Sequence, residues 1–401
     1  MITRPVMLGD VADTCLGKML DQRKNKGEFQ PYLANINVRW GGFDLENLPQ
    51  MRFAENEEER YGIRYGDILV CEGGEPGRCA IWKEELPNMK FQKALHRVRV
   101  HEDEVDCYWL FYRFLLARAR GEFDQYFSGT TTIKHMPGDK LVKIRLDLPE
   151  LSTQKRIGEI LSAYDALIET NQRQIKLLEE AAQRLYKEWF VDLRYPGHEN
   201  VPVVDGVPEG WIACALDDVI EFNPKISLNK DRVKQCVPMA ALSTQSMILN
   251  SSEFTQTTST SGSKFQNGDT LLARITPCLE NGKTGFVAGL DSDEGAVGST
   301  EFIVMRSKQL NPYMVYLLAR TDDFRKTAIN SMTGSDGRQR AQPEKIRAYP
   351  FLLPPNSIIG SFGDVVKPIF DTIQKRNQQN AQLSEARDRL LPKLMSGEIT
   401  V

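Results

Sequence analysis

The feature that most constrains the fold of this chain is a long apolar pattern in residues 148–190. Apolar side chains recur there at steps that alternate between four and three residues, and the pattern lasts for more than four heptads. This spacing is typical of the seam of a coiled coil. A helix of about 40 residues is roughly 60 Å long, more than one compact core needs, so we expect it to pack against a partner. The predicted seam consists of Ile157, Leu161, Tyr164, Ile168, Asn171, Ile175, Leu178, Ala182, Leu185 and Trp189.

The same pattern returns 205 positions later, in residues 353–395, without a gap. The nearest partner for the first long helix is therefore the second one. A polar residue such as Asn171 or Arg376 inside an apolar seam favours one register over others. Two unrelated core helices in two separate domains are the alternative interpretation. The second seam consists of Phe362, Val366, Ile369, Ile373, Arg376, Asn380, Leu383, Arg387, Leu390 and Leu394.

Shorter elements repeat in the same order as the long helices. Shared order and shared spacing across several elements predict a tandem duplication. A length of 401 residues also favours two or more domains, because single cores rarely grow that large. The repeated pairs are residues 8–11 with 216–219, a buried strand at 65–70 with one at 267–272, and an amphipathic helix at 106–120 with one at 311–320.

The duplication sets the predicted domain boundaries. Each copy is expected to hold a globular domain of roughly 150 residues followed by one long helix. Pro196-Gly197 is expected to end the first long helix, and residues 208–211, PEGW, to enter the second copy. We place a first domain at 1–150, a long helix at 151–195, a linker at 196–211, a second domain at 212–352 and a second long helix at 353–401.

Composition favours a soluble cytoplasmic protein, and the sequence offers no catalytic motif. The chain is 41% hydrophobic and 26% charged, and no apolar run approaches the ~20 residues of a membrane span. Its seven cysteines lack a CxxC pair and its four histidines lack metal-ligand spacing, so we expect reduced thiols and no metal. No phosphate loop, GxSxG turn or HExxH motif is present. Residues 311–313, NPY, resemble part of an amino-methyltransferase motif but lack its second proline, and we predict a helix start there.

Two loops in each copy carry side chains suited to nucleic acid. The net charge of -3 means that a polyanion has to bind local basic patches. The loops at 129–135 and 334–340 combine glycine, small hydroxyls and cations, which donate hydrogen bonds to phosphates and purine edges. The other pair of loops lies around residue 78 and at 274–283. A solvated turn is the alternative for any single loop. The candidate contacts are Arg78, Thr131, Thr132, Lys134, Arg274, Thr276, Asn281, Lys283, Arg338 and Arg340.

With this repeat, the chain resembles over its whole length the specificity subunit of a type I restriction-modification system. The resemblance is carried by the duplicated order of domain and helix and by LPELSTQKRIGEIL, which opens the first long helix. It is also carried by PEGW at 208–211 before residues 216–219, by TPCLENGK at 276–283 and by SGTT at 128–131. The first copy departs from the pattern, because it has EGGE at 72–75 where the second has TPCLENG. For this reason we do not carry DNA contacts over from one loop to the other.

The resemblance implies an α/β (α+β) protein in which two tandem target recognition domains are separated by two long antiparallel coiled-coil helices, as a pseudo-twofold internal repeat. It implies a non-catalytic reader of double-stranded DNA that acts in phage defence, each domain reading one half of an asymmetric bipartite target. The helices would dock two methyltransferase subunits, which bind S-adenosylmethionine and methylate adenine. Motor-endonuclease subunits would add ATP- and Mg-dependent cleavage, and this chain itself would hold no cofactor.

A coiled-coil scaffold whose globular ends bind proteins is the competing hypothesis. The net charge of -3 and the acidic stretch from Glu55 to Glu59 motivate it. Such a scaffold would show no salt-dependent binding of DNA, even with a methyltransferase present. Phosphate contacts, by contrast, make affinity fall steeply with salt.

Overall fold

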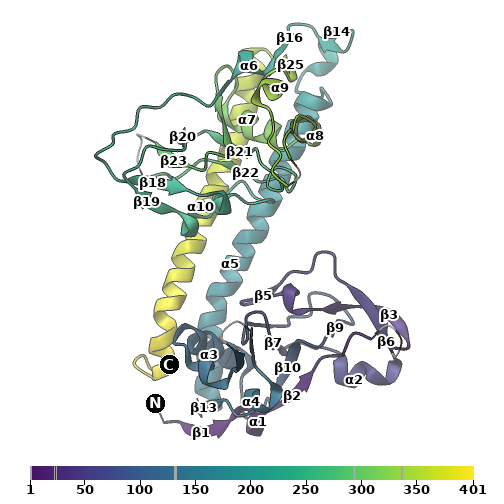
Figure 1. The fold of residues 1–401 in the computed structure, drawn as a ribbon, viewed down its shortest axis with the longest axis vertical. Coiled ribbons are helices and arrows are strands. Elements are labelled where there is room, and N and C mark those ends of the chain that lie inside the picture. Colours follow the sequence, from purple (N-terminus) through teal and green to yellow (C-terminus); the bar gives the residue numbers. More distant parts are fainter. Residues whose placement is uncertain (1, 22, 24, 131–132, 292–294, 336) are drawn as a thin grey trace. The chain divides into compact units, whose positions relative to one another are not determined.

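The chain folds into two compact units, each of which contains one globular domain and parts of both long helices. The computed structural model describes residues 2–401 except 22, 24, 131–132, 292–294 and 336. One unit is formed by Met1–Ile168 with Gln382–Val401, and the other by Glu169–Ala381. The long helices are α5 (Leu151–Tyr186) and α10 (Asn356–Ser396) (Figure 1). This division differs from the predicted boundaries, which gave each long helix a segment of its own, because neither helix buries its seam without the other.

The domain of the first unit is built on a four-stranded antiparallel sheet in the order β2-β10-β7-β8. Strand β1 pairs with β13, and β3 lies between β6 and β9. The strands are β1 (Arg4–Met7), β2 (Ala12–Leu16), β3 (Glu28–Leu33), β4 (Val38–Arg39), β5 (Gly42–Phe43), β6 (Gln50–Phe53), β7 (Ile68–Cys71), β8 (Cys79–Ile81), β9 (Lys90–Phe91), β10 (Leu95–Val100), β11 (Ser128–Thr130), β12 (Ile133–His135) and β13 (Arg145–Leu148). The shorter helices are α1 (Leu8–Val11), α2 (Glu58–Tyr61), α3 (Cys107–Ala119) and α4 (Gly138–Leu141).

The second unit repeats this topology with the sheet β17-β24-β21-β22 and the pair β16 with β25. Its second sheet, in the order β19-β18-β23-β20, matches the sheet β6-β3-β9 of the first unit in the order and direction of three strands and adds β20 as a fourth. The strands are β14 (Val203–Val204), β15 (Val207–Pro208), β16 (Ile212–Ala215), β17 (Ile220–Phe222), β18 (Lys234–Val237), β19 (Thr255–Thr257), β20 (Ser263–Phe265), β21 (Thr270–Ala273), β22 (Thr284–Phe286), β23 (Ala296–Gly298), β24 (Phe302–Ser307) and β25 (Pro350–Leu353). The shorter helices are α6 (Leu216–Val219), α7 (Pro312–Ala319), α8 (Asp322–Asn330) and α9 (Pro343–Arg347).

A buried ion pair occurs at the same place in both sheets. Arg99 donates two hydrogen bonds of 2.7 Å to the carboxylate of Asp67, whose side chain is 1% exposed. Arg306 donates two bonds of 2.8 and 2.7 Å to Asp269, which is also 1% exposed. Equal strand order and an equal ion pair confirm the tandem duplication predicted from the sequence.

The turn before each of these central strands also recurs. Gly66 and Gly268 have φ values of +86° and +91°, a left-handed conformation that side chains rarely adopt. The aspartate after each glycine accepts a backbone hydrogen bond of 2.8 Å, from Arg64 in the first unit and from Gln266 in the second. Strands β7 and β21 follow these turns and are buried along their whole length, as predicted.

The helices α3 and α7 begin with the same cap. The side chain of Asp106 accepts a hydrogen bond of 2.8 Å from the backbone of Trp109, and that of Asn311 accepts one of 2.9 Å from Met314. Both caps satisfy a backbone donor that a helix start leaves free. Pro312 occupies the first turn, where its missing N–H costs nothing. The NPY sequence at 311–313 is therefore a helix start, as predicted.

A glycine in each long helix lets these caps approach closely. A Cβ atom built on Gly158 of α5 would lie 2.6 Å from Oδ1 of Asp106. One built on Gly363 of α10 would lie 3.2 Å from Nδ2 of Asn311. Distances this short leave little or no room for a side chain. The start of α3 therefore packs directly against the backbone of α5, and the start of α7 packs against that of α10.

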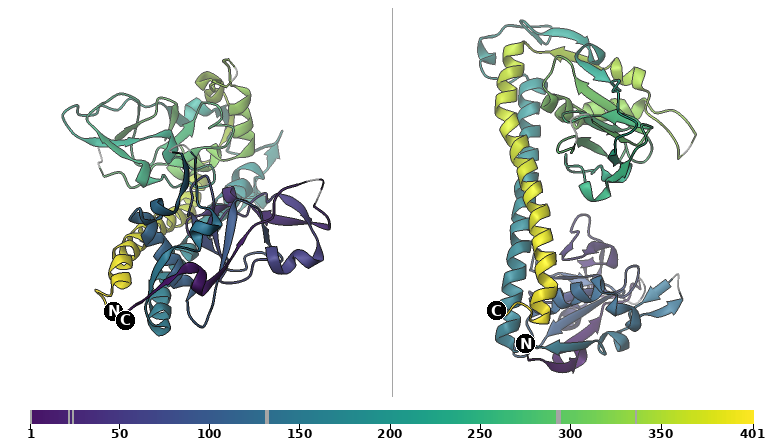
Figure 2. Two further views of the ribbon diagram at one scale, coloured as in Figure 1. Left: turned by 60° about the horizontal axis from the view of Figure 1, so that its bottom comes forward. Right: turned by 90° about the vertical axis from the view of Figure 1, so that its left-hand side faces the viewer.

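Within each unit α5 and α10 pack side by side and run in opposite directions (Figure 2). In the first unit Asp165, in the first half of α5, is bonded to Arg387, near the end of α10. In the second unit the Trp189 ring lies 5.4 Å from that of Phe362, in the first turns of α10. The apolar seam residues face inward, since these side chains are all buried or half-buried: Ile157, Leu161, Tyr164, Ile168, Ile175, Leu178, Leu185, Trp189, Val366, Ile369, Ile373, Leu383, Leu390 and Leu394.

The region between the two copies is packed into the core of the second unit. The α-helical part of α5 ends at Tyr186, and a π-helical turn follows at Lys187–Val191, whereas the sequence predicted a helix to residue 195. This turn keeps Phe190 against Phe362, with ring centroids 4.8 Å apart. Trp211, in the predicted linker, is 6% exposed and belongs to the same core. Among the described residues, no helix is long and apolar enough to cross a membrane.

Candidate nucleic-acid interface

The first predicted loop of the first unit is a β-hairpin that presents a lysine. Strands β11 and β12 pair antiparallel, with Gly129 opposite Lys134. The Lys134 side chain is 47% exposed, and its ammonium lies 5.5 Å from the ring centre of Phe127 and 4.0 Å from Asp124. A ring face and a distant carboxylate orient this cation without neutralising it. Thr131 and Thr132, also predicted as contacts, lie outside the described residues.

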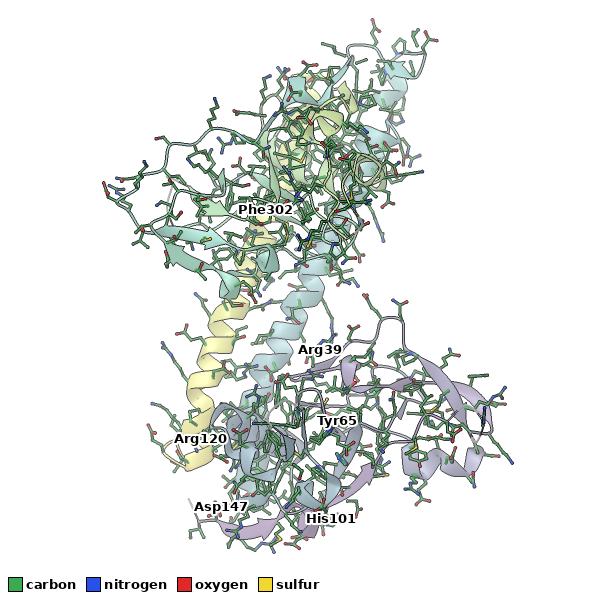
Figure 3. The ribbon with its side chains drawn as sticks, viewed as in Figure 1. Arg39, Tyr65, His101, Arg120, Asp147 and Phe302 are labelled. Carbon is green, nitrogen blue, oxygen red and sulfur yellow. The ribbon has the colours of Figure 1, made fainter. Side chains whose placement is uncertain are left out.

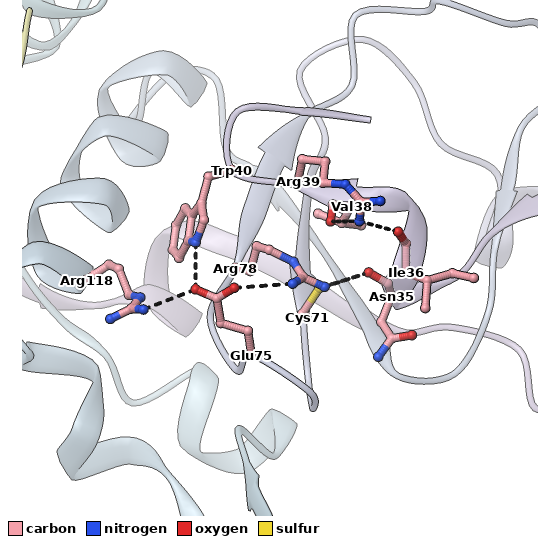
Figure 4. Close-up of polar contacts among 9 residues, drawn as sticks. All are labelled: Asn35, Ile36, Val38, Arg39, Trp40, Cys71, Glu75, Arg78 and Arg118. Atoms are coloured by element: carbon pink, nitrogen blue, oxygen red, sulfur yellow. Dashed lines mark hydrogen bonds and ion pairs between the residues drawn. The ribbon is translucent and has the colours of Figure 1, made fainter. Parts of the chain in front are cut away.

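Arg78 supports the second loop of the first unit. Its guanidinium donates a hydrogen bond of 2.8 Å to the backbone oxygen of Asn35 and one of 3.2 Å to Glu75 (Figure 4). Glu75 also accepts bonds from the Trp40 indole at 2.9 Å and from Arg118 at 3.1 Å. These donors, the indole first among them, hold the pKa of the Glu75 carboxyl below its usual range. With its side chain 18% exposed, Arg78 holds the loop in place and offers little surface to a ligand.

Arg118 and Arg120 are exposed cations that the sequence analysis did not single out. Their side chains are 53% and 52% exposed at the end of α3, and Arg120 is labelled in Figure 3. Arg118, Lys134 and Glu75 line one cavity of about 300 Å³. The signal that would have found Arg118 is its position in the last turn of a predicted helix, next to a predicted loop.

In the second unit two predicted loops form one surface. The backbone N–H of Thr276 donates a hydrogen bond of 3.0 Å to Gln339, and that of Ala341 donates one of 2.8 Å to Arg274. The loop at 274–283 therefore lies along the loop at 334–340. The sequence predicted both loops but gave no reason to join them, because their contact depends on backbone geometry.

The carboxylate of Glu301 holds two arginines of this joined surface, Arg274 and Arg340, in position. Glu301 accepts a hydrogen bond of 2.7 Å from Nη2 of Arg340, and its other oxygen lies 3.4 Å from Nε of Arg274. The bonds from Arg340 hold the pKa of the Glu301 carboxyl below its usual range. The two arginine side chains remain 40% and 31% exposed. Two cations on one anion leave a net positive charge whose geometry is fixed before any ligand binds.

The remaining candidates of the second unit differ in what holds them. Lys283 donates a hydrogen bond of 3.0 Å to the backbone oxygen of Met239, so its ammonium is already engaged. The Thr276 hydroxyl is buried and makes no hydrogen bond within the described residues. Asn281 and Arg338 are exposed. No hydrogen bond or ion pair joins the Arg338 guanidinium to another side chain in the described part of the chain, which leaves it available to a ligand.

A cavity of about 550 Å³ adjoins Arg274 in the second unit. Lys225, Lys264 and Arg274 contribute three cations to its lining, and Phe302, labelled in Figure 3, contributes an aromatic wall. Neither lysine was predicted from the sequence, because both lie outside the duplicated loops. The described residues contain no group of three or more histidine, cysteine, aspartate or glutamate side chains arranged to hold a metal ion.

Comparisons with known proteins agree on one family. A family model described as the type I restriction modification DNA specificity domain matches residues 4–180. The type I restriction enzyme MjaIX specificity subunit of Methanocaldococcus jannaschii is 24% identical over 351 residues, which cover 84% of this chain and 78% of that protein. The EcoEI specificity subunit of Escherichia coli is 31% identical over 199 residues, 47% of this chain and 33% of that protein. The crystal structure of an S subunit from M. genitalium matches 98% of this chain and 95% of that one, with a TM-score of 0.57 and 13% identity, and so shares its fold.

Proposed function

Because the chain belongs to the family of type I restriction-modification specificity subunits, we propose that it is the non-catalytic subunit that reads DNA sequence for such a system. Each globular domain would read one half of an asymmetric bipartite target. The chain would bind no cofactor of its own.

The observation that carries this proposal is one framework with two different surfaces. Both domains have the same sheet order and the same buried ion pair. The first presents Lys134 and Arg118, whereas the second presents Arg338 beside the two arginines on Glu301. Side chains that differ on a common scaffold favour two different base sequences, since base edges are read by hydrogen-bond geometry.

The long helices would hold the two readers at a fixed spacing and dock the catalytic subunits. Leu167 and Leu177 of α5 are 55% and 64% exposed, and Val365 of α10 is 49% exposed. Exposed apolar side chains on these helices support a role in binding other proteins. The partners would be two methyltransferase subunits, which bind S-adenosylmethionine and methylate adenine, and motor-endonuclease subunits, which use ATP and Mg.

Gap length tests this function directly. The assembled complex with its methyltransferase subunits should bind a duplex carrying both half-sites, and binding should weaken when the gap changes by one or two base pairs. One added base pair moves a half-site by ~3.4 Å and turns it by roughly 35°, so its base contacts are lost. We expect a loss of about tenfold or more, since one mismatched base pair costs about 1–3 kcal/mol. Equal binding at every gap length would contradict the proposal.

A pair of arginine variants tests the surfaces. Arg338→Ala in the complex should weaken binding of cognate DNA by about 1–3 kcal/mol if the side chain reaches a base, and should mainly reduce the salt dependence if it reaches a phosphate. Arg78→Ala is the matched control, because that guanidinium is engaged within its own domain. We expect it to lower stability more than affinity. The scaffold alternative predicts no salt-dependent binding for any variant.

A further inference from the structure

Each globular domain is built on one helix of its own copy and one helix of the other. The core of the first unit includes Ile157 and Leu161 from α5 together with Leu391 and Leu394 from α10. The core of the second unit joins parts of both helices in the same way. Because the two copies have similar seams, the long helix of a second molecule is a competing partner. Unless specific residues prevent it, a first copy can then pair with another first copy, or a second copy with another second copy.

The first unit contains a polar triad where its two long helices meet. The Tyr112 hydroxyl, from α3, donates a hydrogen bond of 2.5 Å to Oδ2 of Asp165. Arg387, from α10, is hydrogen-bonded to Oδ1 of the same carboxylate. The Asp165 and Arg387 side chains are 23% and 21% exposed, and Tyr112 is 1% exposed. A half-buried charge pair of this kind depends on both partners being present.

The equivalent positions in the second unit are apolar. A shift of 205 residues moves Tyr112 to Leu317 and Asp165 to Phe370, and it relates Arg387 to Ala182. Those three side chains belong to one apolar core cluster and are at most 2% exposed. The Phe370 ring lies 4.8 Å from that of Tyr313 and 5.1 Å from that of Phe286. The same place in the duplicated fold therefore holds charges in one unit and aromatic packing in the other.

A second polar contact lies in the seam of the second unit. Asn171 of α5 donates a hydrogen bond of 2.9 Å to Asn380 of α10 and accepts one of 3.2 Å from Arg376. Asn171 and Arg376 are equivalent positions of the two copies, and the equivalent of Asn380 is Ile175. This contact is also satisfied only when α5 meets α10.

Pairing of like copies would leave these groups without their partners on the other helix, and Arg387 would keep only its ion pair with Asp388 of its own helix. If α5 of a second molecule replaced α10, Ala182 would stand at the place of Arg387 and Ile175 at the place of Asn380. Asp165 would then keep a half-buried charge without its cation. If α10 replaced α5, Arg387 would enter the aromatic core of the second unit, and Arg376 would face its own copy. Like charges and unpaired buried groups both oppose such pairing.

We infer that the Asp165–Arg387 pair and the Asn171–Arg376–Asn380 contacts form a pairing code that joins α5 to α10 and excludes the same helix of a second copy. The code acts between the two copies of the duplicated unit and does not depend on DNA binding. The contacts disfavour pairing of each long helix with the same helix of a second molecule of this chain.

Charge reversal in the full chain tests the pairing. Asp165→Arg or Arg387→Asp alone places like charges where the helices of one molecule meet. The two single variants carry different affinity tags and are mixed. If they exchange α10 between molecules, each α5 meets an α10 of opposite charge at these two positions, so both charge pairs are restored. We expect the two tags to co-purify in a two-chain species at least about tenfold more than two wild-type chains do. The double variant Asp165→Arg/Arg387→Asp should behave like the wild type.

Two further variants keep this test decisive. Arg389→Asp is the matched control, because Arg389 pairs with Glu385 on the same helix at 2.6 Å and is 78% exposed. It should leave pairing unchanged. If the single reversals fail to fold, Asp165→Phe with Arg387→Ala copies the residues of the second unit and keeps an apolar contact. This variant should form two-chain species in light scattering at least several times more than the wild type. The inference is overturned if the mixed reversals co-purify no more than wild-type chains do, or, where the reversals do not fold, if the apolar variant shows no gain.

Discussion

Replacing Asp67 by asparagine removes one charge from the duplicated ion pair and keeps the shape of the side chain. The amide oxygen still accepts the backbone bond from Arg64, whereas Arg99 loses its anion. Removal of one partner from a buried pair typically costs about 3–5 kcal/mol. Since the Arg99 side chain retains 20% exposure, the expected loss for the first unit is at the low end, about 3 kcal/mol.

This loss is measurable by amide hydrogen exchange with mass spectrometry, which separates the two units. A loss of about 3 kcal/mol in stability corresponds to a roughly 150-fold increase in the equilibrium constant for opening, and so in the exchange rate of the protected amides. We expect it in peptides that contain β7 of the first unit and much less in those that contain β21 of the second. In urea the first unit should unfold at a midpoint lowered by about 1 M, for a slope of ~2–3 kcal/mol per M.

An exposed ion pair of the same unit provides the control. Arg39 and Asp44 lie 3.2 Å apart with side chains 56% and 44% exposed. Asp44→Asn should therefore cost less than about 1 kcal/mol. The reasoning is refuted if Asp67→Asn costs no more than Asp44→Asn, or if β21 loses as much protection as β7.

Two stability predictions follow from packing. Phe362→Ala should destabilise the second unit by about 3–5 kcal/mol in chemical denaturation, because a fully buried ring is removed. Val365→Ala, three residues away and 49% exposed, should change stability by less than about 0.5 kcal/mol. Gly158→Ala should lower the melting temperature, because the new Cβ would lie 2.6 Å from Oδ1 of Asp106. At Gly360 the new Cβ would meet none of the described atoms within 4 Å outside the adjacent residues and helix backbone, so Gly360→Ala should raise stability by about 0.5–1 kcal/mol through helix propensity.

The sequence predicted the repeated framework well, because periodicity and local caps determine it. The apolar seams, repeated at a shift of 205 residues, predicted which side chains of the two long helices would be buried. The helix start at Asn311 was predicted from its cap and from the proline that follows it. The end of the first long helix was less predictable. Its π-helical turn at Lys187–Val191 depends on the packing of Phe190 against Phe362, which are far apart in the sequence.

The DNA contacts stay a prediction, and the sequence could not show which of these side chains are already engaged within the protein. Residue type marked Arg78 as a DNA contact, but its bonds to Asn35 and Glu75 hold it inside its own domain. Arg118 was overlooked because the candidates predicted from the sequence were taken from loops, whereas Arg118 lies in the last turn of the amphipathic helix predicted at 106–120. The engagement of Arg78 depends on long-range contacts of a single side chain, which no local pattern reports.

The central claim is that one duplicated chain holds two different readers at one spacing. Mapping methylated adenines across the genome of cells that carry this chain with the methyltransferase subunits proposed as its partners tests it most directly. The account predicts one asymmetric motif with two specified halves and a single unspecified gap, and Arg338→Ala should relax or abolish only the half read by the second domain. A continuous motif, or one whose gap length varies from site to site, would contradict it.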